Sequence, residues 1–334
     1  GLEVDERFGS GNTALMAAAR NGSMPCVEAL LAKGARPNLR NEDGWTTLIF
    51  AARGGNPDIV KLFLDKGISR NAKTNRGRTA LMYAASSRST ESVKLLLERG
   101  AKINAKTNEG WTPLMFASVR DNPVVLEMML EREAKVNEKL KVGGTALMMA
   151  VSRGFVENAR ILLDHSAKVN NQRKGGWTAL MLAASRGRDE AVRLLLDRGA
   201  KVDSENDTGK TALMLASAKG HTDIVQILLA AGADVRARQK DGITALIGSA
   251  LEGQTEAARL LLDSGADVNS SSKDGGTALM YAAREGHHEV VELLLARGAK
   301  VNARTKGGRT ALALARKAGH VEAARLLEQA GARR

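Results

Sequence analysis

The 334-residue sequence is poor in cysteine and in aromatic residues. Its single cysteine, Cys26, excludes an intramolecular disulfide and any metal cluster built on several cysteines. Aromatic residues make up only 3% of the chain, although hydrophobic residues make up 43%. A core must therefore be built from Ala, Leu, Val and Met, which favours close packing of helices over a β-sandwich.

The sequence also lacks any apolar run near the roughly 20 residues that a membrane span needs. We therefore expect a soluble protein, and we expect it to be a monomer. The single cysteine fits a reducing compartment. A cytoplasmic location is favoured on this ground, and an exported form stays open.

Motifs for catalysis and cofactor binding are missing. Residues 9–14 formally fit a dinucleotide-binding glycine pattern, but no strand pattern precedes them. Residues 208–211 resemble the end of a phosphate-binding loop, but Ser204 stands where that loop needs a glycine. No serine–histidine–aspartate group, paired carboxylates or metal site can be placed in a shared pocket. We expect no enzymatic activity, no cofactor and no bound metal.

Acidic residues are outnumbered by basic ones. The chain has 50 Lys and Arg against 37 Asp and Glu, which gives a formal net charge of +13. A basic excess of this size favours acidic partners, including acidic proteins, phosphorylated ligands and nucleic acid. It is equally compatible with a role in solubility alone.

What the sequence does contain is a strict internal repeat. A threonine followed two residues later by leucine recurs ten times at intervals of 33 residues, from Thr13 to Thr310, without any insertion. A glycine precedes each of these threonines by two residues, from Gly11 to Gly308. A period of this length predicts a solenoid in which stacked repeats share one continuous core.

Each conserved column of the repeat has a physical role. The glycine before the threonine predicts a turn with positive φ, and the threonine predicts the N-cap of a short helix. A polar break with glycine follows in eight repeats. A leucine-rich second helix comes next, and Pro57 and Pro123 stand at its expected first position after asparagine. Glycine then ends this helix, and a polar stretch such as residues 102–110 predicts a projecting hairpin.

These columns resemble the ankyrin repeat family. The resemblance rests on Thr-Ala-Leu or Thr112-Pro113-Leu114, followed by Ala-Ala, Leu-Leu, Gly-Ala and Val-Asn at a period of 33. It implies an all-α solenoid of ten helix–turn–helix units with projecting β-hairpin loops, whose first helices and hairpin tips line a concave groove. We expect residues 1–8 to be an N-terminal extension and residues 9–332 to form the repeat domain, with a polar cap as its last repeat.

The sequence departs from the family pattern in two ways. The family places a histidine after Thr-Pro-Leu. At this position the chain has Met or Ile in nine repeats and Ala313 in the last, so we expect an apolar stack of these side chains. Repeats three to five also lack several glycines. Arg88 and Asp121 replace the mid-repeat glycine, and Glu133 and Ser166 replace the glycine that ends the second helix. A functional zone, a local bend and neutral drift are all open interpretations.

Aromatic residues gather in the two columns that should face the groove. One column is the residue before each threonine, and the other is the fourth residue after it. These 20 positions hold seven of the ten aromatic residues: Trp45, Trp111, Trp177, Phe50, Phe116, Tyr83 and Tyr281. Trp and Tyr are typical anchors of binding interfaces. Packing between neighbouring repeats is the alternative.

A basic column runs beside the aromatic ones. It holds Arg120, Arg153, Arg186 and Lys219, eight residues after successive threonines. Cations at helix C-termini are also favoured by the helix dipole. A second basic column at the end of the second helices, which includes Arg99 and Arg297, is interpreted as dipole complement and solubility.

We therefore predict a non-enzymatic scaffold that binds a protein or an acidic peptide in the groove. A nucleotide or nucleic acid bound in the same groove is one alternative, because bases stack on aromatic rings and phosphates pair with Arg. An engineered or fused scaffold with no single natural ligand is another. The predicted contact residues are Trp45, Phe50, Tyr83, Trp111, Phe116, Arg120, Met149, Arg153, Trp177, Leu182, Arg186 and Lys219.

Overall fold

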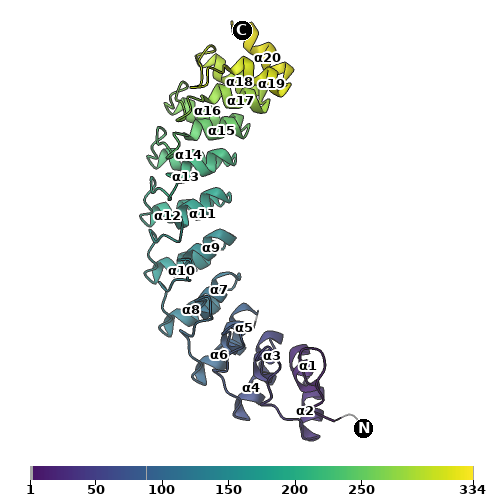
Figure 1. The fold of residues 1–334 in the computed structure, drawn as a ribbon. Helices are drawn as coiled ribbons and strands as arrows, with labels where there is room; N and C mark the ends of the chain where they lie inside the picture. The colour runs from purple at the N-terminus through teal and green to yellow at the C-terminus, as the bar shows by residue number, and fades with distance from the viewer. Residues whose placement is uncertain (1–2, 88, 334) are drawn as a thin grey trace. The chain divides into compact units, whose positions relative to one another are not determined.

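A computed structural model describes residues 3–87 and 89–333. The chain divides into two compact units, residues 1–168 and 169–334. The described residues form twenty short α-helices arranged as ten successive pairs, and their only β-pairing consists of isolated bridges within the hairpin loops (Figure 1). The prediction of an all-α repeat architecture is therefore confirmed.

Each pair has a shorter first helix and a nine-residue second helix. In the first unit the first helices are α1 (Ala14–Asn21), α3 (Thr47–Gly54), α5 (Ala80–Ser86), α7 (Pro113–Ser118) and α9 (Ala146–Arg153). The second helices are α2 (Met24–Ala32), α4 (Pro57–Asp65), α6 (Thr90–Glu98), α8 (Pro123–Glu131) and α10 (Val156–Asp164).

The second unit repeats the same pattern. Its first helices are α11 (Ala179–Ser185), α13 (Ala212–Ala218), α15 (Ala245–Leu251), α17 (Ala278–Glu285) and α19 (Ala311–Ala318). Its second helices are α12 (Asp189–Asp197), α14 (Thr222–Ala230), α16 (Thr255–Asp263), α18 (His288–Ala296) and α20 (Val321–Gln329).

The helix ends follow the predicted signals. The repeat threonine caps each first helix by accepting a hydrogen bond from the third helical N–H, as Thr112 does from Met115 at 3.3 Å. Thr79 is the exception, because its hydroxyl has no partner although it is buried. Asn56 caps α4 in the same way, directly before Pro57. The predicted terminal glycines adopt positive φ one residue after the C-cap of the second helix.

The core lies between the helices of successive repeats. The Met and Ile column after the threonine is almost fully buried, from Met16 at 0% exposure to Met280 at 2%, as an apolar stack requires. In the last repeat the same column ends in the exposed Ala313, and the polar side chains of α19 and α20, including Arg316, Arg325 and Glu328, are exposed.

Hairpins connect the repeats by backbone and side-chain hydrogen bonds. The amide of Asn75 donates to the carbonyl of Asp43, one repeat earlier, and Asn108 donates to Arg76 in the same way. Gly77 must be glycine here, since a Cβ would lie 2.9 Å from the amide nitrogen of Asn108. The backbone therefore packs hairpin against hairpin.

Basic side chains of the hairpins add a ladder that the sequence interpretation did not foresee. Arg7 donates to the carbonyl of Arg40 at 3.0 Å, and Lys73 donates to the carbonyl of Lys106 at 3.1 Å, each spanning 33 residues. In the second unit Arg238 donates to the carbonyl of Ser271 at 2.9 Å. Part of the positive charge thus connects neighbouring repeats.

The basic column at the ends of the second helices also makes specific contacts. Arg99 pairs with Asp65 at 2.6 Å, and Arg297 pairs with Asp263 at 2.8 Å, in each case across one repeat. The interpretation of this column as dipole complement and solubility alone was therefore incomplete. Exposed pairs of this kind contribute at most about 1 kcal/mol each.

Candidate functional site

The candidate site is a groove of about 790 Å³ in the first unit. It crosses repeats two to four and is formed by hairpin tips, by residues of α3, α5 and α7, and by the turns that follow α5 and α7. Its lining residues are Asp43, Trp45, Arg53, Thr74, Asn75, Arg76, Arg78, Tyr83, Ser86, Ser87, Trp111, Phe116, Val119 and Arg120. We call it the aromatic–arginine groove.

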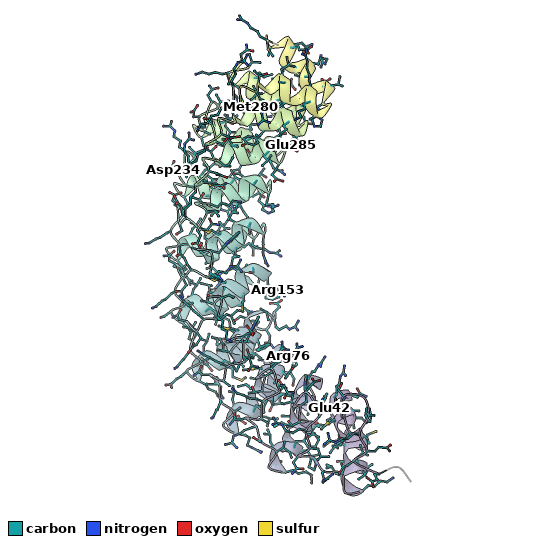
Figure 2. The ribbon with its side chains drawn as sticks, in the orientation of Figure 1. Glu42, Arg76, Arg153, Asp234, Met280 and Glu285 are labelled. Carbon is teal, nitrogen blue, oxygen red and sulfur yellow. The ribbon has the colours of Figure 1, made fainter. Side chains whose placement is uncertain are left out.

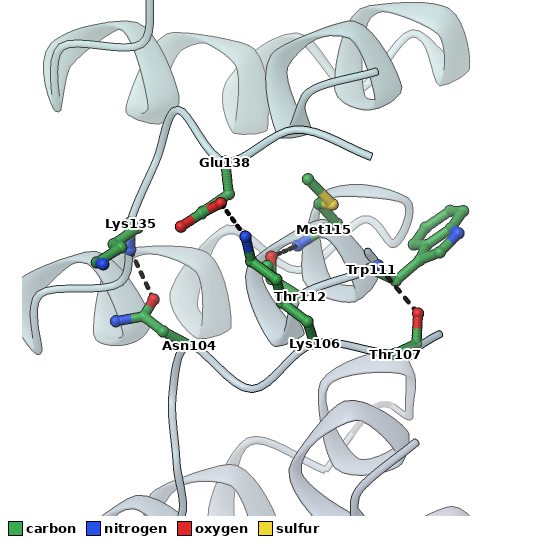
Figure 3. A network of polar contacts seen from close by, with 8 residues as sticks. All are labelled: Asn104, Lys106, Thr107, Trp111, Thr112, Met115, Lys135 and Glu138. Atoms are coloured by element: carbon green, nitrogen blue, oxygen red, sulfur yellow. Dashed lines mark hydrogen bonds and ion pairs between the residues drawn. The ribbon is translucent and has the colours of Figure 1, made fainter. Parts of the chain in front are cut away.

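The tryptophans of the groove are held in place by their own hairpins. The amide of Trp111 donates to the hydroxyl of Thr107 at 3.0 Å, and the amide of Trp45 donates to the side chain of Asn41 at 2.7 Å. Figure 3 shows Trp111 on one side of this hairpin, next to the capping contact between Thr112 and Met115. A short hydrogen bond within the hairpin thus fixes the backbone from which each indole projects.

Lys106 connects the same hairpin to the next repeat. Its ammonium group pairs with Glu138 at 2.5 Å, while the side chain of Asn104 accepts from the amide of Lys135 (Figure 3). These contacts fix the hairpin of repeat four relative to repeat five. They lie beside the groove and do not belong to its lining.

The aromatic rings form two clusters. Trp45 lies 4.9 Å from Phe50 and 4.5 Å from Tyr83 between ring centroids. Trp111 lies 5.1 Å from Phe116. All three pairs are tilted, and contacts of this kind contribute about 0.5–1.5 kcal/mol beyond their buried area. The rings are therefore partly structural, which fixes their positions before any ligand arrives.

Arginines lie over the faces of these rings. The guanidinium carbon of Arg53 is 5.3 Å from the centre of the Trp45 ring. That of Arg78 is 5.8 Å from the Tyr83 ring and 5.5 Å from the Phe116 ring. Arg78 is thus shared by the two aromatic clusters.

The groove carries an excess of positive charge. Four arginines face a single carboxylate, that of Asp43, and among the described residues none of the four forms an ion pair. The N–H groups of Arg53 and Arg78 stay available because the ring faces against which they lie, unlike carboxylates, do not accept bidentate hydrogen bonds. Arg76 and Arg153 are among the side chains labelled in Figure 2.

The groove coincides with the irregular part of the repeat. In eight repeats the turn between the two helices contains a glycine, and those described adopt positive φ. The two turns without it are those of repeats three and four, and both contribute to the groove through Ser86, Ser87, Val119 and Arg120. Arg88, which replaces the first missing glycine, lies outside the described residues.

At Asp121 the missing glycine shortens the helix before it. Helix α7 ends at Ser118 after six residues, whereas the other first helices have seven or eight. The carbonyl of Arg120 leaves the helical pattern and accepts from the buried side chain of Asn158 at 2.6 Å. The turn that carries Arg120 is thus attached to the next repeat.

The groove therefore brings together only part of the predicted residue set. Trp45, Tyr83, Trp111, Phe116 and Arg120 line it, and Phe50, which is 7% exposed, packs beneath Trp45.

Met149 and Arg153 lie on α9 outside the groove lining, Met149 half-buried and Arg153 exposed at the end of the helix. The remaining predicted residues belong to the second unit. Trp177 packs on its own hairpin, with its Cδ1 atom 3.3 Å from the Cβ position of Gly175 and the guanidinium of Arg173 at 5.5 Å from its ring. Leu182 is 6% exposed. Arg186 and Lys219 are exposed C-caps of α11 and α13.

Three arginines of the groove were missed as site residues. Arg53 stands seven residues after its threonine rather than eight, outside the predicted basic column. Arg78 belongs to the hairpin-tip column, but only its aromatic members were singled out. Arg76 lies at the same tip, and no periodic signal marks it.

The second unit has a smaller hollow of about 40 Å³ around Tyr281. Arg284 lies 5.0 Å from the Tyr281 ring, and the tyrosine hydroxyl is 3.2 Å from that of Ser272. The Ser272 hydroxyl also donates to Asp274, and this hydrogen bond holds the pKa of the Asp274 carboxyl below its usual range. Tyr281 thus fills its own hollow and leaves little room for a ligand.

Comparison with known families decides the class of the protein. The family model for ankyrin repeats (three copies) matches residues 2–74, 69–140, 133–206, 199–272 and 269–333. The chain belongs to the ankyrin repeat family. No curated protein matches the chain. Ankyrin repeats are generally non-enzymatic scaffolds for protein–protein interaction.

None of the helices among the described residues has the length and apolar character to cross a bilayer. Within residues 3–87 and 89–333, no three His, Cys, Asp or Glu side chains are grouped as metal ligands. Cys26 is exposed on α2.

Proposed function

We propose that this ankyrin protein is a binding scaffold that takes up an acidic segment of a partner protein in the aromatic–arginine groove. One observation carries the proposal: four arginines without carboxylate partners and four partly exposed aromatic rings line a single groove. Aromatic rings supply apolar contact area, and arginine supplies charge-assisted hydrogen bonds to carboxylates.

The arrangement supports a peptide better than a nucleotide. A base needs an open ring face for stacking, but Arg53 lies over Trp45 and Arg78 lies over Tyr83 and Phe116. Among the described residues, Trp111 is the one ring of the groove without an arginine over it. Carboxylates can approach the outer edges of the guanidinium groups without displacing them.

Selection from a random twelve-residue peptide display library tests the proposal. We expect peptides enriched on the wild-type protein to be acidic and to lose at least tenfold in affinity on Trp45→Ala, Trp111→Ala double substitution. Trp177→Ala is the matched control, because this tryptophan also stands at a hairpin tip but lies outside the groove. Intact helicity of each variant is checked by circular dichroism.

Two results would overturn the proposal. One is the absence of enriched peptides, and the other is an enriched set that binds the double variant as well as the wild type. The nucleotide alternative is measured with a fluorescent twelve-nucleotide oligothymidine. Tight binding of this probe that depends on Trp45 and Trp111, and that weakens steeply with salt, would favour the alternative. If the wild-type protein binds neither the peptides nor the oligothymidine, the groove has no ligand of either class, which would favour a scaffold without a ligand at this site.

A further inference from the structure

Arg78 occupies a position that no other residue of the groove shares. Its guanidinium lies between Tyr83 on α5 and Phe116 on α7, at 5.8 and 5.5 Å from the two ring centres. Its backbone is fixed as well, because the amide of Arg78 donates to the hydroxyl of Thr74 at 3.1 Å. Arginine stacked on rings keeps its planar set of N–H donors in one orientation, so little conformational entropy is lost when an anion binds.

The charges along the groove alternate with the rings. Arg53 lies over Trp45 in the first cluster, Arg78 lies between the clusters, and Arg120 stands in the turn after α7, which carries Phe116 of the second cluster. A complementary ligand therefore needs apolar side chains for the two clusters and an anion between them. Asp43 is the only acidic residue in the groove lining, and among the described residues it forms no ion pair with Arg78.

The spacing of the clusters fixes the spacing of the ligand side chains. The ring centres of Tyr83 and Phe116 are at most 5.8 plus 5.5 Å apart, since both contact the same guanidinium. Both residues hold the same position in successive repeats, and neighbouring helices pack about 8–10 Å apart. A polyproline II chain has three residues per turn and rises about 3.1 Å per residue, so side chains three residues apart lie on the same face at about 9 Å, which matches this distance.

We propose that Arg78 is the specificity-determining residue of the groove, and that it binds an acidic side chain between two apolar side chains three residues apart in a peptide of polyproline II conformation. The ligand sequence is then apolar–acid–x–apolar or apolar–x–acid–apolar. The inference rests on the proposed function, which requires only that an acidic segment binds in the groove. The inference adds two details: Arg78 as the residue that binds the acidic side chain, and the order of the apolar and acidic side chains in the ligand.

Parallel peptide selections on the wild type and on Arg78→Gln test the inference. On the wild type we expect the enriched peptides to share an acid within an apolar pair of this spacing. On Arg78→Gln we expect the apolar pair to persist and the acid between them to be lost. The chain provides a matched control in Arg309→Gln, because Arg309 has the same place before its threonine and the same amide contact to a threonine hydroxyl, Thr305, at 3.1 Å.

A double-mutant cycle gives the quantitative readout. The most enriched wild-type peptide is measured with its central acid intact and changed to the corresponding amide, against wild type, Arg78→Gln, Arg78→Lys and Arg309→Gln. Either the peptide change or Arg78→Gln alone should weaken binding about ten- to a hundredfold, and the two together should cost little more than one. Arg78→Lys should restore only part of the loss, because lysine lacks the planar donor set. Arg309→Gln should change affinity less than twofold.

The outcomes separate this inference from the proposed function. Acidic peptides that depend on Trp45 and Trp111 but keep their acid preference in Arg78→Gln overturn the inference and leave the proposed function standing. Additive effects in the cycle do the same. A wild-type selection without any enriched peptide overturns both. Because Arg78 is half-buried and makes no ion pair among the described residues, its replacement should leave the fold intact, which a thermal unfolding curve checks.

Discussion

Glu133 and Ser166 hold backbone conformations that elsewhere in the repeat belong to glycine. They are the only residues other than glycine among those described with positive φ, at 61° and 65°. Each stands one residue after the C-cap of its helix, α8 and α10, in a position that glycine fills in the other repeats. For an L-residue this conformation costs about 1–2 kcal/mol. The repeats keep these residues at a local loss of stability.

Relief of this backbone strain at a single residue should stabilise the protein. Glu133→Gly should raise the free energy of unfolding of the first unit by about 0.5–1 kcal/mol, because relief of the strain exceeds the extra backbone entropy of glycine. Glu127→Gly is the control, since the same change in the middle of α8, at an exposed position, should destabilise by about 1 kcal/mol. Urea unfolding curves measure both. A loss of stability in Glu133→Gly would show that its side chain outweighs the strain.

At the scale of the helical pair, the mid-repeat glycine and the next repeat's histidine form one packing unit. The ring of His287 lies against Gly253, so closely that a Cβ on this glycine would be 2.6 Å from Nδ1. Nε2 of the same ring lies 3.1 Å from the carbonyl of Leu251 at the end of α15. His221 lies against Gly187 and His320 against Gly286 in the same way, so a histidine at this position has a packing role between repeats.

A comparison of Gly253→Ala with Gly199→Ala separates the free energy of the histidine contact from that of backbone strain. Gly199→Ala meets no atom within 4 Å, so it reports only the strain of positive φ, which is about 1 kcal/mol. Gly253→Ala should destabilise the second unit by about 1–2 kcal/mol more, because it also displaces the His287 ring. The additional loss should disappear when His287→Ala is introduced alongside. Equal effects of the two glycine substitutions in urea unfolding would refute this account.

For the whole molecule, the position of the groove predicts where a ligand acts. Hydrogen exchange of the protein saturated with a wild-type-selected peptide should slow in α3, α5 and α7 and in the hairpins before them. At a ligand concentration of 100 times the dissociation constant, the gain in protection corresponds to about 2.7 kcal/mol. The amides around Tyr281 in the second unit should exchange at an unchanged rate. Protection centred on that tyrosine instead would place the ligand site in the wrong unit.

The period of 33 made the fold predictable, because each helix end depends on local signals. Thr112 as an N-cap, Pro57 at a first helical position and the turn glycines need only their neighbours in sequence. The groove was predictable in part, since periodicity places Trp45 and Trp111 in one column and Tyr83 and Phe116 in another. Periodicity could not show that Arg78 lies over two rings, because that contact depends on side-chain conformations across a repeat boundary.

The basic columns show the limit of composition as evidence. The net charge predicts an affinity for acidic partners, but it does not identify which basic side chains are free to contact one. Lys73 is engaged with the carbonyl of Lys106, and Arg99 with Asp65, whereas Arg53 and Arg78 are held only by ring faces. The difference lies in what each side chain contacts one repeat away.

Asparagine side chains form a second ladder of hydrogen bonds between the hairpins, and this ladder has a consequence for how the gene can change. Asn71 accepts from the amide of Lys102, Asn104 from Lys135 and Asn137 from Lys168, always over 31 residues. Each of these hydrogen bonds depends only on the next 33-residue repeat of the chain, which we call a cassette. Duplication or loss of a whole 33-residue cassette by recombination leaves every remaining asparagine with an equivalent partner. An insertion of one or two codons inside a hairpin separates a rung from its partner, so inheritance in complete cassettes keeps the array uniform.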